Sequence, residues 1–145
     1  MTSDETRNLL HRSYEAFNKG ERLFVLDLFH SDIEWIMHSP PEALPIPNRV
    51  QGKFNVLAAL KRIDDVVEAV RTDLELVMVE GDRAVAICDN ALRQRGSGRM
   101  MRYKSAAFHQ YRDGQLIQYQ AFFDGFDILQ QALGREIPVP QVYPV

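Results

Sequence analysis

Three side chains of this sequence could carry acid–base chemistry, and they are Tyr14, His38 and Asp124. Tyr14 lies on the apolar face of a helix that the spacing of its neighbours predicts. His38 ends a predicted strand just before a proline-rich loop, where a histidine could act near neutral pH at the mouth of a pocket. Asp124 ends the last predicted strand. Each also has a structural explanation, as a core tyrosine, a solvated histidine and a helix-capping aspartate, and both interpretations stay open on the sequence.

Asn90 is a candidate of a second kind, a polar residue that strand alternation places on one face with Cys88 and Leu92. Cys88 is the single cysteine, and a buried thiol without a neighbouring base or cation behaves as a small apolar group. His109 has strand neighbours on both sides, which favours a structural role. No two histidines or carboxylates share metal-ligand spacing on one element, and phosphate-loop, nucleophile-elbow and dinucleotide motifs are absent. The sequence therefore predicts neither a metal nor a cofactor.

Two helices are expected before the first strand. Tyr14 and Phe17 belong to an apolar repeat at helical spacing over residues 3–19, which places both on the buried face. A shorter helix is expected over residues 21–29. These helices would hold the tyrosine in place.

A strand, a loop and a third helix follow. Residues 32–38 alternate as a strand with Trp35 and Met37 on one face. Residues 39–48 hold four of the seven prolines, which predicts a stiff loop. A third helix is expected from Gly52 to about Val67.

The second half of the chain has the period of a sheet. Turn signals at 80–82, 96–98 and 113–114 divide residues 69–124 into four strands joined as consecutive hairpins. Helices first and an antiparallel sheet afterwards predict an α+β domain, with a strongly curved, mainly antiparallel sheet wrapped around the N-terminal helices. We expect one domain over residues 1–134 and an extended, proline-rich tail over 135–145.

The last strand alternates between two faces. Ile117, Tyr119, Ala121 and Phe123 are expected on the buried face, and Leu116 on the largely wet one.

Composition bounds the class of protein. A length of 145 residues suits one domain, and 46% hydrophobic with 26% charged residues is ordinary for a globular protein. A net charge of −3 gives no reason to expect nucleic acid as a partner. No apolar run approaches the roughly 18 to 20 residues of a membrane span, and the first residues are polar and acidic. With one cysteine, these features predict a cytoplasmic protein that does not enter a membrane.

The order of elements resembles a known superfamily. Three helices, a strand with Trp35, a proline-rich loop ending at Gly52, four strands and the closing DGQLIQYQAFFD resemble the nuclear transport factor 2-like superfamily, and most of all its SnoaL-like branch. Relatives there include polyketide cyclases, ketosteroid isomerases and limonene epoxide hydrolase. The resemblance covers residues 5–133 and implies a conical α+β barrel, an apolar pocket between sheet and helices, and a homodimer. It does not imply one chemistry.

The catalytic groups of the isomerases and cyclases carry over only in part. The first-helix tyrosine of the isomerases is matched by Tyr14, but their general base falls at Met37 and their protonated second acid near Ser105 or Ala106. A proton shuttle without a base cannot work. Asp124 is the nearest acidic candidate for the cyclases' acid–base residue.

The epoxide hydrolase mechanism does not carry over. Its Asp-Arg-Asp arrangement falls at Asn90, Cys88 and Ala121, and its water-holding tyrosine and asparagine fall at Trp35 and Met37. The resemblance therefore implies the conical fold with its apolar pocket, but not the mechanism of the epoxide hydrolase.

Strand alternation and helix stripes predict the side chains that line the pocket. They are mostly apolar or aromatic with a few hydroxyl and amide groups, as in many small-molecule sites. The predicted lining is Tyr14, Phe17, Trp35, Met37, Ile63, Val67, Cys88, Asn90, Leu92, Tyr103, Ser105, Tyr119 and Phe123.

Two functions remain open on the sequence. The first is a SnoaL-like protein that holds an apolar cyclic or aromatic small molecule and could act on it as a cofactor-independent isomerase, cyclase or hydrolase, with Tyr14, His38 and Asp124 as acid–base candidates. The second is a non-catalytic ligand-binding or dimeric association module with the same fold. The missing carboxylates favour the second.

One hairpin is basic and carries Arg93, Arg95, Arg99, Arg102 and Lys104. Such charge usually keeps an exposed hairpin soluble, and an anionic partner is the alternative.

Overall fold

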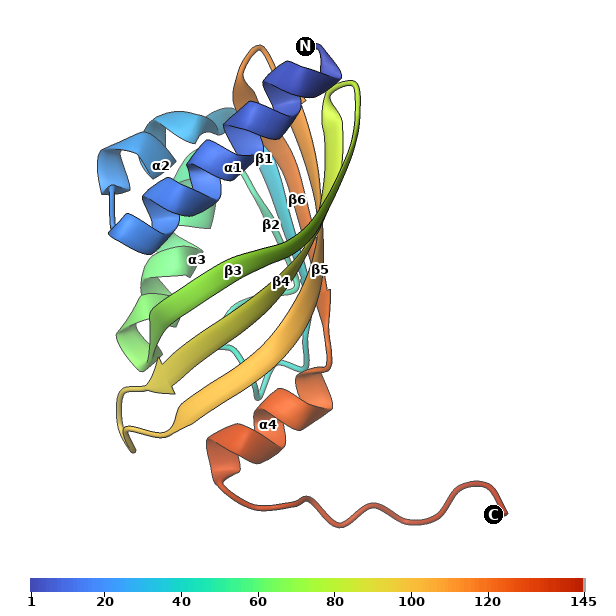
Figure 1. Ribbon diagram of the computed structural model, residues 1–145. Coiled ribbons are helices and arrows are strands. Elements are labelled where there is room, and N and C mark those ends of the chain that lie inside the picture. Colours follow the sequence, from blue (N-terminus) through green and yellow to red (C-terminus); the bar gives the residue numbers. More distant parts are fainter. Residues whose placement is uncertain (145) are drawn as a thin grey trace.

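The protein is described by a computed structural model that covers residues 1–144 and contains four helices and six strands (Figure 1). In chain order they are α1 (Ser3–Lys19), α2 (Arg22–Leu28), β1 (Phe29–His38), β2 (Arg49–Gln51), α3 (Lys53–Val66), β3 (Val67–Glu80), β4 (Arg83–Gln94), β5 (Met100–Arg112), β6 (Gln115–Phe123) and α4 (Gly125–Leu133). No helix in this part of the chain is long and apolar enough to cross a membrane. The sequence missed β2, a three-residue strand that directly follows the proline-rich loop.

All six strands form one mixed sheet in the order β2-β1-β6-β5-β4-β3. Strands β3 to β6 are the predicted consecutive hairpins, whereas β1 runs parallel to β6 and antiparallel to β2. The α+β fold is confirmed, and the sheet curves strongly around the helices without closing, because β2 and β3 remain its edges.

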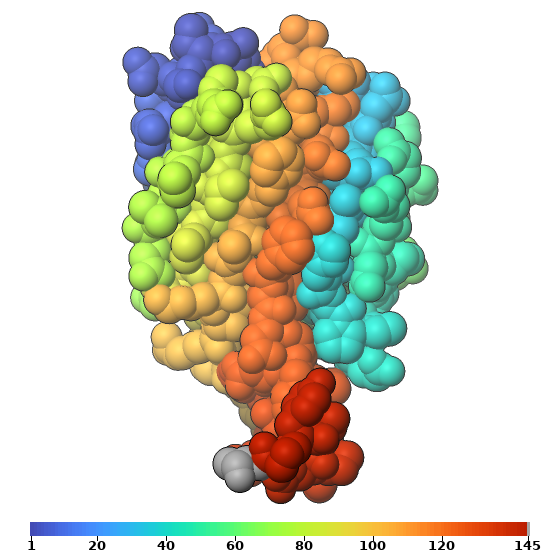
Figure 2. Space-filling view, turned by 90° about the vertical axis from the view of Figure 1, so that its right-hand side faces the viewer, coloured from blue at the N-terminus to red at the C-terminus, as the bar shows by residue number. Residues whose placement is uncertain are grey.

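The two faces of the sheet have different surroundings. Helices α1, α2 and α3 lie on its concave side (Figure 1). In the described part of the chain, the opposite face carries no helix across its strands (Figure 2). We call these two sides the inner face and the outer face.

Helix α1 is fixed to the sheet at both of its ends. The Thr2 side chain caps its first turn, and the Thr6 hydroxyl donates to the Gly81 carbonyl at 2.6 Å. Near the other end, the Asn18 amide donates to the Thr72 carbonyl at 2.7 Å and accepts from the Thr72 N–H at 2.9 Å. Side chains in the middle of α1 are therefore held over the inner face.

A β-bulge in β6 changes the face of two predicted residues. Tyr111 pairs with Leu116 while Gln110 pairs with Gln118, so Ile117 is an extra residue without a partner. As a result Leu116 is buried in the core at 3% exposure, and Ile117 lines a hollow with outer-face residues. The predicted placement of both residues was wrong, because simple alternation does not foresee a bulge.

The core consists of two clusters of apolar residues. The larger one joins α2 and α3 to β1, the proline-rich loop and the β5–β6 hairpin, and its largest fully buried members are Tyr111, Ile33 and Val56. The smaller one joins α1 to β4 and contains Leu10 of the helix with Ala84, Ala86 and Cys88 of the strand.

Helix α4 takes the place of a strand along the end of β5. Strand β6 stops opposite Ser105, so the backbone of Arg102 has no strand on that side. The Gln131 amide accepts from the Arg102 N–H at 2.8 Å and donates to the Arg102 carbonyl at 2.8 Å, which satisfies both groups. Residues 135–144 then contain no helix or strand.

Candidate functional site

The register of the sheet shows which side chains meet on the inner face, because directly paired residues point to the same side. Two rows of polar and aromatic residues cross the sheet there. The first consists of Cys88 on β4, Ser105 on β5 and Phe123 on β6, and the second of His109 on β5, Tyr119 on β6 and Trp35 on β1.

A row of small residues separates these two rows. It consists of Ala86, Ala107 and Ala121, whose exposure is 0%, 1% and 2%. Tyr14 of α1 packs at this end of the sheet, against the cluster that contains Ala86 and Cys88. The methyl side chains leave space for its ring between the polar rows.

Tyr14 and His109 form the central polar pair of the inner face. The Tyr14 hydroxyl lies 2.9 Å from His109 Nε2, and the two rings meet edge to face with centroids 5.6 Å apart. His109 is only 3% exposed, and its Nδ1 atom has no hydrogen-bond partner in residues 1–144. A histidine and a tyrosine in contact can exchange a proton without a cofactor.

Burial keeps this pair uncharged. Burial lowers the pKa of His109 to about 4, although the nearby backbone of Ala84 and Ala107 acts in the opposite direction. Burial also raises the pKa of Tyr14 well above its ordinary value, and the neighbouring Tyr119 and Cys88 raise it further. At pH 7 the pair is therefore a neutral imidazole beside a neutral phenol.

Cys88, Ser105 and Asn90 continue the polar inner surface. The Asn90 amide donates to the Ser105 hydroxyl at 2.9 Å, and Cys88 is buried between β3 and β5. Burial raises the pKa of the Cys88 thiol, while hydrogen bonds with Tyr14 and Ser105 act in the opposite direction. With a raised pKa, Cys88 is a thiol at neutral pH and not a nucleophilic thiolate.

Aromatic rings cover the rest of the inner face. Trp35 stacks on Tyr119 with centroids 4.0 Å apart, and Phe29 meets Trp35 edge to face. Tyr103 leans on Phe123 at 5.4 Å. Trp35, Tyr103, Tyr119 and Phe123 each keep part of their surface open, which is what a wall against a ligand requires.

Carboxylates are missing from this surface. Within residues 1–144, the inward positions of β1, β4, β5 and β6 hold no aspartate or glutamate. The same part of the chain has no group of three histidine, cysteine, aspartate or glutamate residues that could hold a metal ion. Any acid–base chemistry on the inner face would therefore depend on Tyr14 and His109.

Asp124 lies outside this surface. Its side chain accepts from the Asp127 N–H at 3.0 Å and caps the first turn of α4. The helix-cap interpretation of Asp124 is confirmed by this geometry.

His38 and Phe17 also lie away from the pair. His38 stacks on Phe122 at 4.4 Å and contacts Gln120 on the outer face, so the structure does not bring it together with Tyr14 and His109. Phe17 is 47% exposed, because the buried side of α1 is formed by Leu10, Ser13 and Ala16. Phe17 follows the buried Ala16 directly, so an error of one residue in assigning the buried side of the helix is enough to explain why Phe17 was expected inside.

The other predicted lining residues stay in the interior or at its border. Met37 and Ile63 pack against the larger core cluster, and Leu92 is half-buried. Val67 is 6% exposed and begins β3 instead of ending α3.

His109 is the site residue that sequence reasoning undervalued. It shares the parity of Tyr103 and Ser105 on β5, and both of those were expected inside. That signal placed His109 on the inner face, but only the fold brings Tyr14 of α1 to it, 95 residues away in sequence.

Two open hollows lie away from the Tyr14–His109 pair. One of about 270 Å³ is lined by Glu34, Gln118 and their neighbours. The other, of about 350 Å³, is lined by Asp89, Lys104 and their neighbours, which include Asn90 and Tyr103. Both are bordered mainly by charged and amide groups of the outer face. Neither contains Tyr14 or His109, and we do not assign the chemistry to them.

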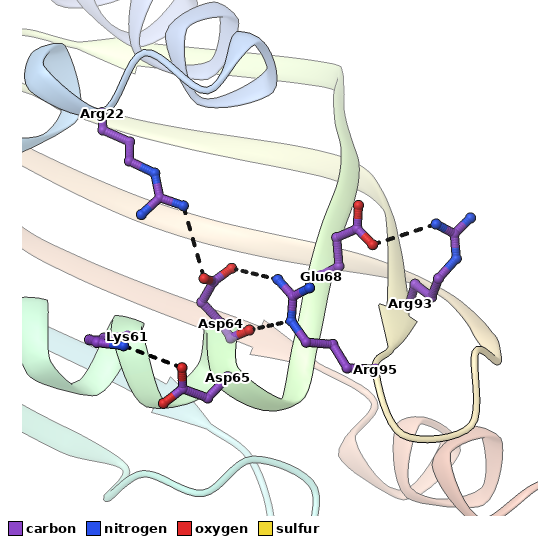
Figure 3. Close-up of polar contacts among 7 residues, drawn as sticks. All are labelled: Arg22, Lys61, Asp64, Asp65, Glu68, Arg93 and Arg95. Carbon is purple, nitrogen blue, oxygen red and sulfur yellow. Dashed lines mark hydrogen bonds and ion pairs between the residues drawn. The ribbon is translucent and has the colours of Figure 1, made fainter.

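Three of the five cationic side chains of the basic hairpin form ion pairs within the chain, and Figure 3 shows two of them. The Arg95 side chain donates to the Asp64 backbone carbonyl at 2.6 Å and lies 3.2 Å from its carboxylate, while Arg93 lies 3.5 Å from Glu68. Lys104 contacts Glu75 at 2.9 Å. These contacts attach the hairpin to the end of α3 and to β3, so much of its charge is already neutralised.

Comparison with known proteins agrees with this architecture. The SnoaL-like domain model matches residues 10–119. No curated protein sequence matches the chain significantly.

Solved structures with the same fold include enzymes of several kinds. A proposed isomerase from Rhodopseudomonas palustris is 28% identical with a TM-score of 0.78, over 90% of this chain and 97% of that one. An epoxide hydrolase from M. tuberculosis, described as LEH-like, is 14% identical with a TM-score of 0.73, over 91% and 92% of the two chains. A proposed polyketide cyclase from Pseudomonas putida is 20% identical with a TM-score of 0.70, over 90% and 98%. The last two likenesses concern the fold alone.

Proposed function

Because this chain belongs to the SnoaL-like domain family, we propose that it binds a compact cyclic or aromatic molecule on the inner face and moves a proton on it without a cofactor. Isomerisation is the reaction class that this proposal favours. The observation that supports it is the buried, uncharged Tyr14–His109 pair at 2.9 Å, beside aromatic rings that keep open surface. The likeness to a proposed isomerase at 28% identity points the same way.

The pair can act on a ligand in two ways, one for each neutral form of the imidazole. With the proton on Nε2, His109 donates to the Tyr14 oxygen, and the Tyr14 O–H is free to donate to a carbonyl oxygen of the ligand. With the proton on Nδ1, Tyr14 donates to Nε2, and the Tyr14 oxygen can accept a proton from the ligand while its own passes to His109. Tyr14 therefore contacts the ligand, and His109 supports it from behind.

Deuterium exchange can test this without knowledge of the natural substrate. Cyclic ketones such as 1-tetralone would be incubated in D2O with the protein, and exchange of the hydrogen next to the carbonyl would be followed by NMR. General acid–base groups contribute about 100- to 10,000-fold to such steps, so Tyr14→Phe and His109→Gln should each lose at least about 100-fold of any catalysed exchange. Asp124→Asn, which alters only a helix cap, should keep it. Exchange that survives in Tyr14→Phe would refute the assignment.

The second candidate is a ligand-binding protein without turnover. The absence of carboxylates from the inward strand positions of residues 1–144 favours it, because the related enzymes named above rely on acidic groups. It predicts that cyclic ketones bind, as measured by calorimetry, while exchange stays at the rate of the buffer.

We also propose that the chain forms a homodimer through its outer face. Two rows of apolar residues cross that face, Leu76, Ile87, Ala106 and Phe122 in one and Met78, Val85 and Phe108 in the other. Leu76 and Met78 are 49% and 64% exposed. Charged rows lie on either side, with Asp73, Asp89 and Lys104 on one and Glu80 and Arg83 on the other. An apolar centre with a charged rim is typical of a two-fold interface, and a monomeric sedimentation profile at micromolar concentration would contradict it.

A cytoplasmic location completes the proposal. It is supported by Cys88, which is the single cysteine and is buried as a free thiol. Fractionation of cells that express a tagged form would test it.

A further inference from the structure

Irregular strand pairing marks the place of the outer-face hollow of about 270 Å³. Residues 30–33 of β1 have no partner on β6, where Ile117 alone separates the two neighbouring paired residues. Ile117 is also the extra residue of the bulge opposite β5. Its side chain therefore lines the hollow together with side chains of β1, β2 and β5. Bulges of this kind often re-aim side chains beside functional sites.

Two side chains of opposite charge border this hollow without pairing. Asp32 comes from β1 and Arg112 from the end of β5. Both are exposed, and within residues 1–144 neither forms an ion pair with the other or with a third residue. The hollow thus offers a carboxylate and a guanidinium at separate points of its wall.

The other charged group of the wall is already held by its neighbours. The Glu34 carboxylate accepts from the Gln118 amide at 2.9 Å and lies 3.3 Å from Arg49. The Gln51 amide donates to the backbone carbonyl of Asp32 at 2.9 Å, which fixes the segment that carries the second carboxylate. Because these contacts occupy Glu34, Asp32 is the carboxylate that is left for a ligand.

We infer that this hollow binds a small zwitterion, a molecule that carries an ammonium and a carboxylate group a few bonds apart. Asp32 accepts from the ammonium group, Arg112 donates to the carboxylate, and Ile117 contacts the carbon chain between them. The site is separate from the proposed function, because its lining contains neither Tyr14 nor His109.

Size and charge select this class of ligand. A volume of about 270 Å³ is below the usual range for drug-sized molecules, so the ligand is small. A simple anion at Arg112 would be repelled by Asp32, and a simple cation at Asp32 would be repelled by Arg112. A zwitterion places each of its charges beside an opposite one and gains from both contacts. Since both side chains are exposed, each contact is weak and the affinity is in the millimolar range.

The hollow lies beside the centre of the proposed dimer interface. Gln110 and Gln118, which line it, belong to the row that also contains Glu80 and Arg83. This row is the charged rim of the proposed interface, and the rim of an interface remains accessible to solvent. A small zwitterion can therefore reach the hollow in a dimer as well as in a monomer.

Matched ligands test the site by NMR titration of the whole chain. Glycine, β-alanine and 4-aminobutyrate separate the two charges by increasing lengths. Each would be compared with the acid that lacks its amine and the amine that lacks its carboxylate, such as butyrate and propylamine for 4-aminobutyrate. At least one zwitterion should bind about fivefold more tightly than both of its analogues, because it makes one more contact with a charge. The backbone amide signals of residues 32, 112 and 117 should shift.

Charge-removing variants assign the two contacts. Arg112→Gln should weaken the best zwitterion about fivefold and remove its advantage over the amine, and Asp32→Asn should remove its advantage over the acid. Arg62→Gln is the matched control, because Arg62 is an exposed arginine of α3 that does not line the hollow, and it should change neither. The amide spectra of the variants show at the same time that they are folded.

Several results would overturn this inference. One is the absence of saturation below about 50 mM for all three zwitterions, and another is equal affinity for a zwitterion and its two analogues. Signal shifts centred on Tyr14 and His109 would place the ligand on the inner face and would also refute the site. None of these results bears on deuterium exchange in cyclic ketones, which tests the proposed function separately.

Discussion

The two faces of the sheet carry different kinds of polar side chain. On the inner face the polar side chains are neutral phenols, an imidazole, a thiol and an amide, and burial shifts the pKa of Tyr14, Cys88 and His109 toward the uncharged form. On the outer face the polar groups are charged and paired, such as Lys104 with Glu75 at 2.9 Å, around an apolar centre. Both sets come from the same strands.

This difference follows from strand alternation and from what covers each side. Helices exclude water from the inner face, so a charge there would be costly and a neutral proton donor is effective. The outer face is open to water, so charges are tolerated there, and its exposed apolar rows are the surface of the proposed dimer. The two proposals place chemistry and assembly on opposite faces of the sheet, so changes to one face should leave the other intact.

Matched leucines should give the largest difference between the faces. Leu10 is fully buried on the side of α1 that packs on the sheet, whereas Leu76 is 49% exposed on the outer face. Leu10→Ala should lower the free energy of unfolding by about 2–5 kcal/mol, because it leaves a cavity that the fixed helix cannot fill. Leu76→Ala should change it by less than about 0.5 kcal/mol in the monomer. Urea denaturation at low protein concentration measures both, and equal losses would mean that the two faces are not packed differently.

Acid should act on the inner face through His109. Its pKa falls from 6.5 to about 4 on folding, so the unfolded chain binds the proton more readily between these values. The stability from a neutral His109 is complete above pH 6.5 and is lost as the pH falls toward 4, a change of roughly 3 kcal/mol. Tyr14 and Tyr119, which face it, stay protonated throughout this range.

Carboxylates also titrate in acid. The informative quantity is therefore the loss of stability on acidification, compared between wild type and His109→Gln. Denaturation curves at pH 7 and at pH 4.5 should show a smaller loss of stability on acidification for the variant. Parallel losses for the two proteins would contradict a buried neutral histidine.

Matched valines should separate assembly from folding. Val85 lies in an apolar row of the outer face and is 40% exposed, and Val66 ends α3 and is 42% exposed. Val85→Glu should raise the dimer dissociation constant at least about tenfold, or about 1.4 kcal/mol, because a buried unpaired charge opposes association. Val66→Glu should leave it unchanged. Sedimentation analysis measures this, and the same shift for both valines would indicate a general charge effect.

The sequence alone was sufficient for the order of the helices and hairpins, but not for the short strand β2. Turn signals such as Asp113-Gly114, where both residues have positive φ, determine the hairpins, and helix stripes determine the layer that covers them. These are local patterns, so they can be recognised without the fold. Asp124 as a helix cap is another local pattern, and it was recognised.

The candidate site could be predicted only in part, because it depends on contacts between distant segments. Tyr14 and His109 are each visible on a buried face, but their contact depends on how α1 crosses the sheet. Leu116 and Ile117 exchange faces at a bulge that nothing in the local alternation signals. His38 follows its strand onto the outer face because Trp35 and Met37 already occupy the inner one.

The smallest effect is expected at the ion pairs of the sheet's rim, which belong to neither face. Asp64 lies 3.2 Å from Arg95 and 4.0 Å from Arg22, and its side chain is 50% exposed (Figure 3). Asp64→Asn should lower the free energy of unfolding by at most about 1 kcal/mol, because exposed pairs are weak and the Arg95 side chain keeps its bond to the backbone carbonyl of residue 64. Asp65→Asn, which loses only a contact with Lys61 within α3, should cost about 0.5 kcal/mol or less.

Both differences should shrink in 1 M salt, where exposed charges are screened. A loss at Asp64 that persists in high salt and approaches that of Leu10→Ala would mean that the hairpin is held by a desolvated pair, and that the rim behaves like the inner face.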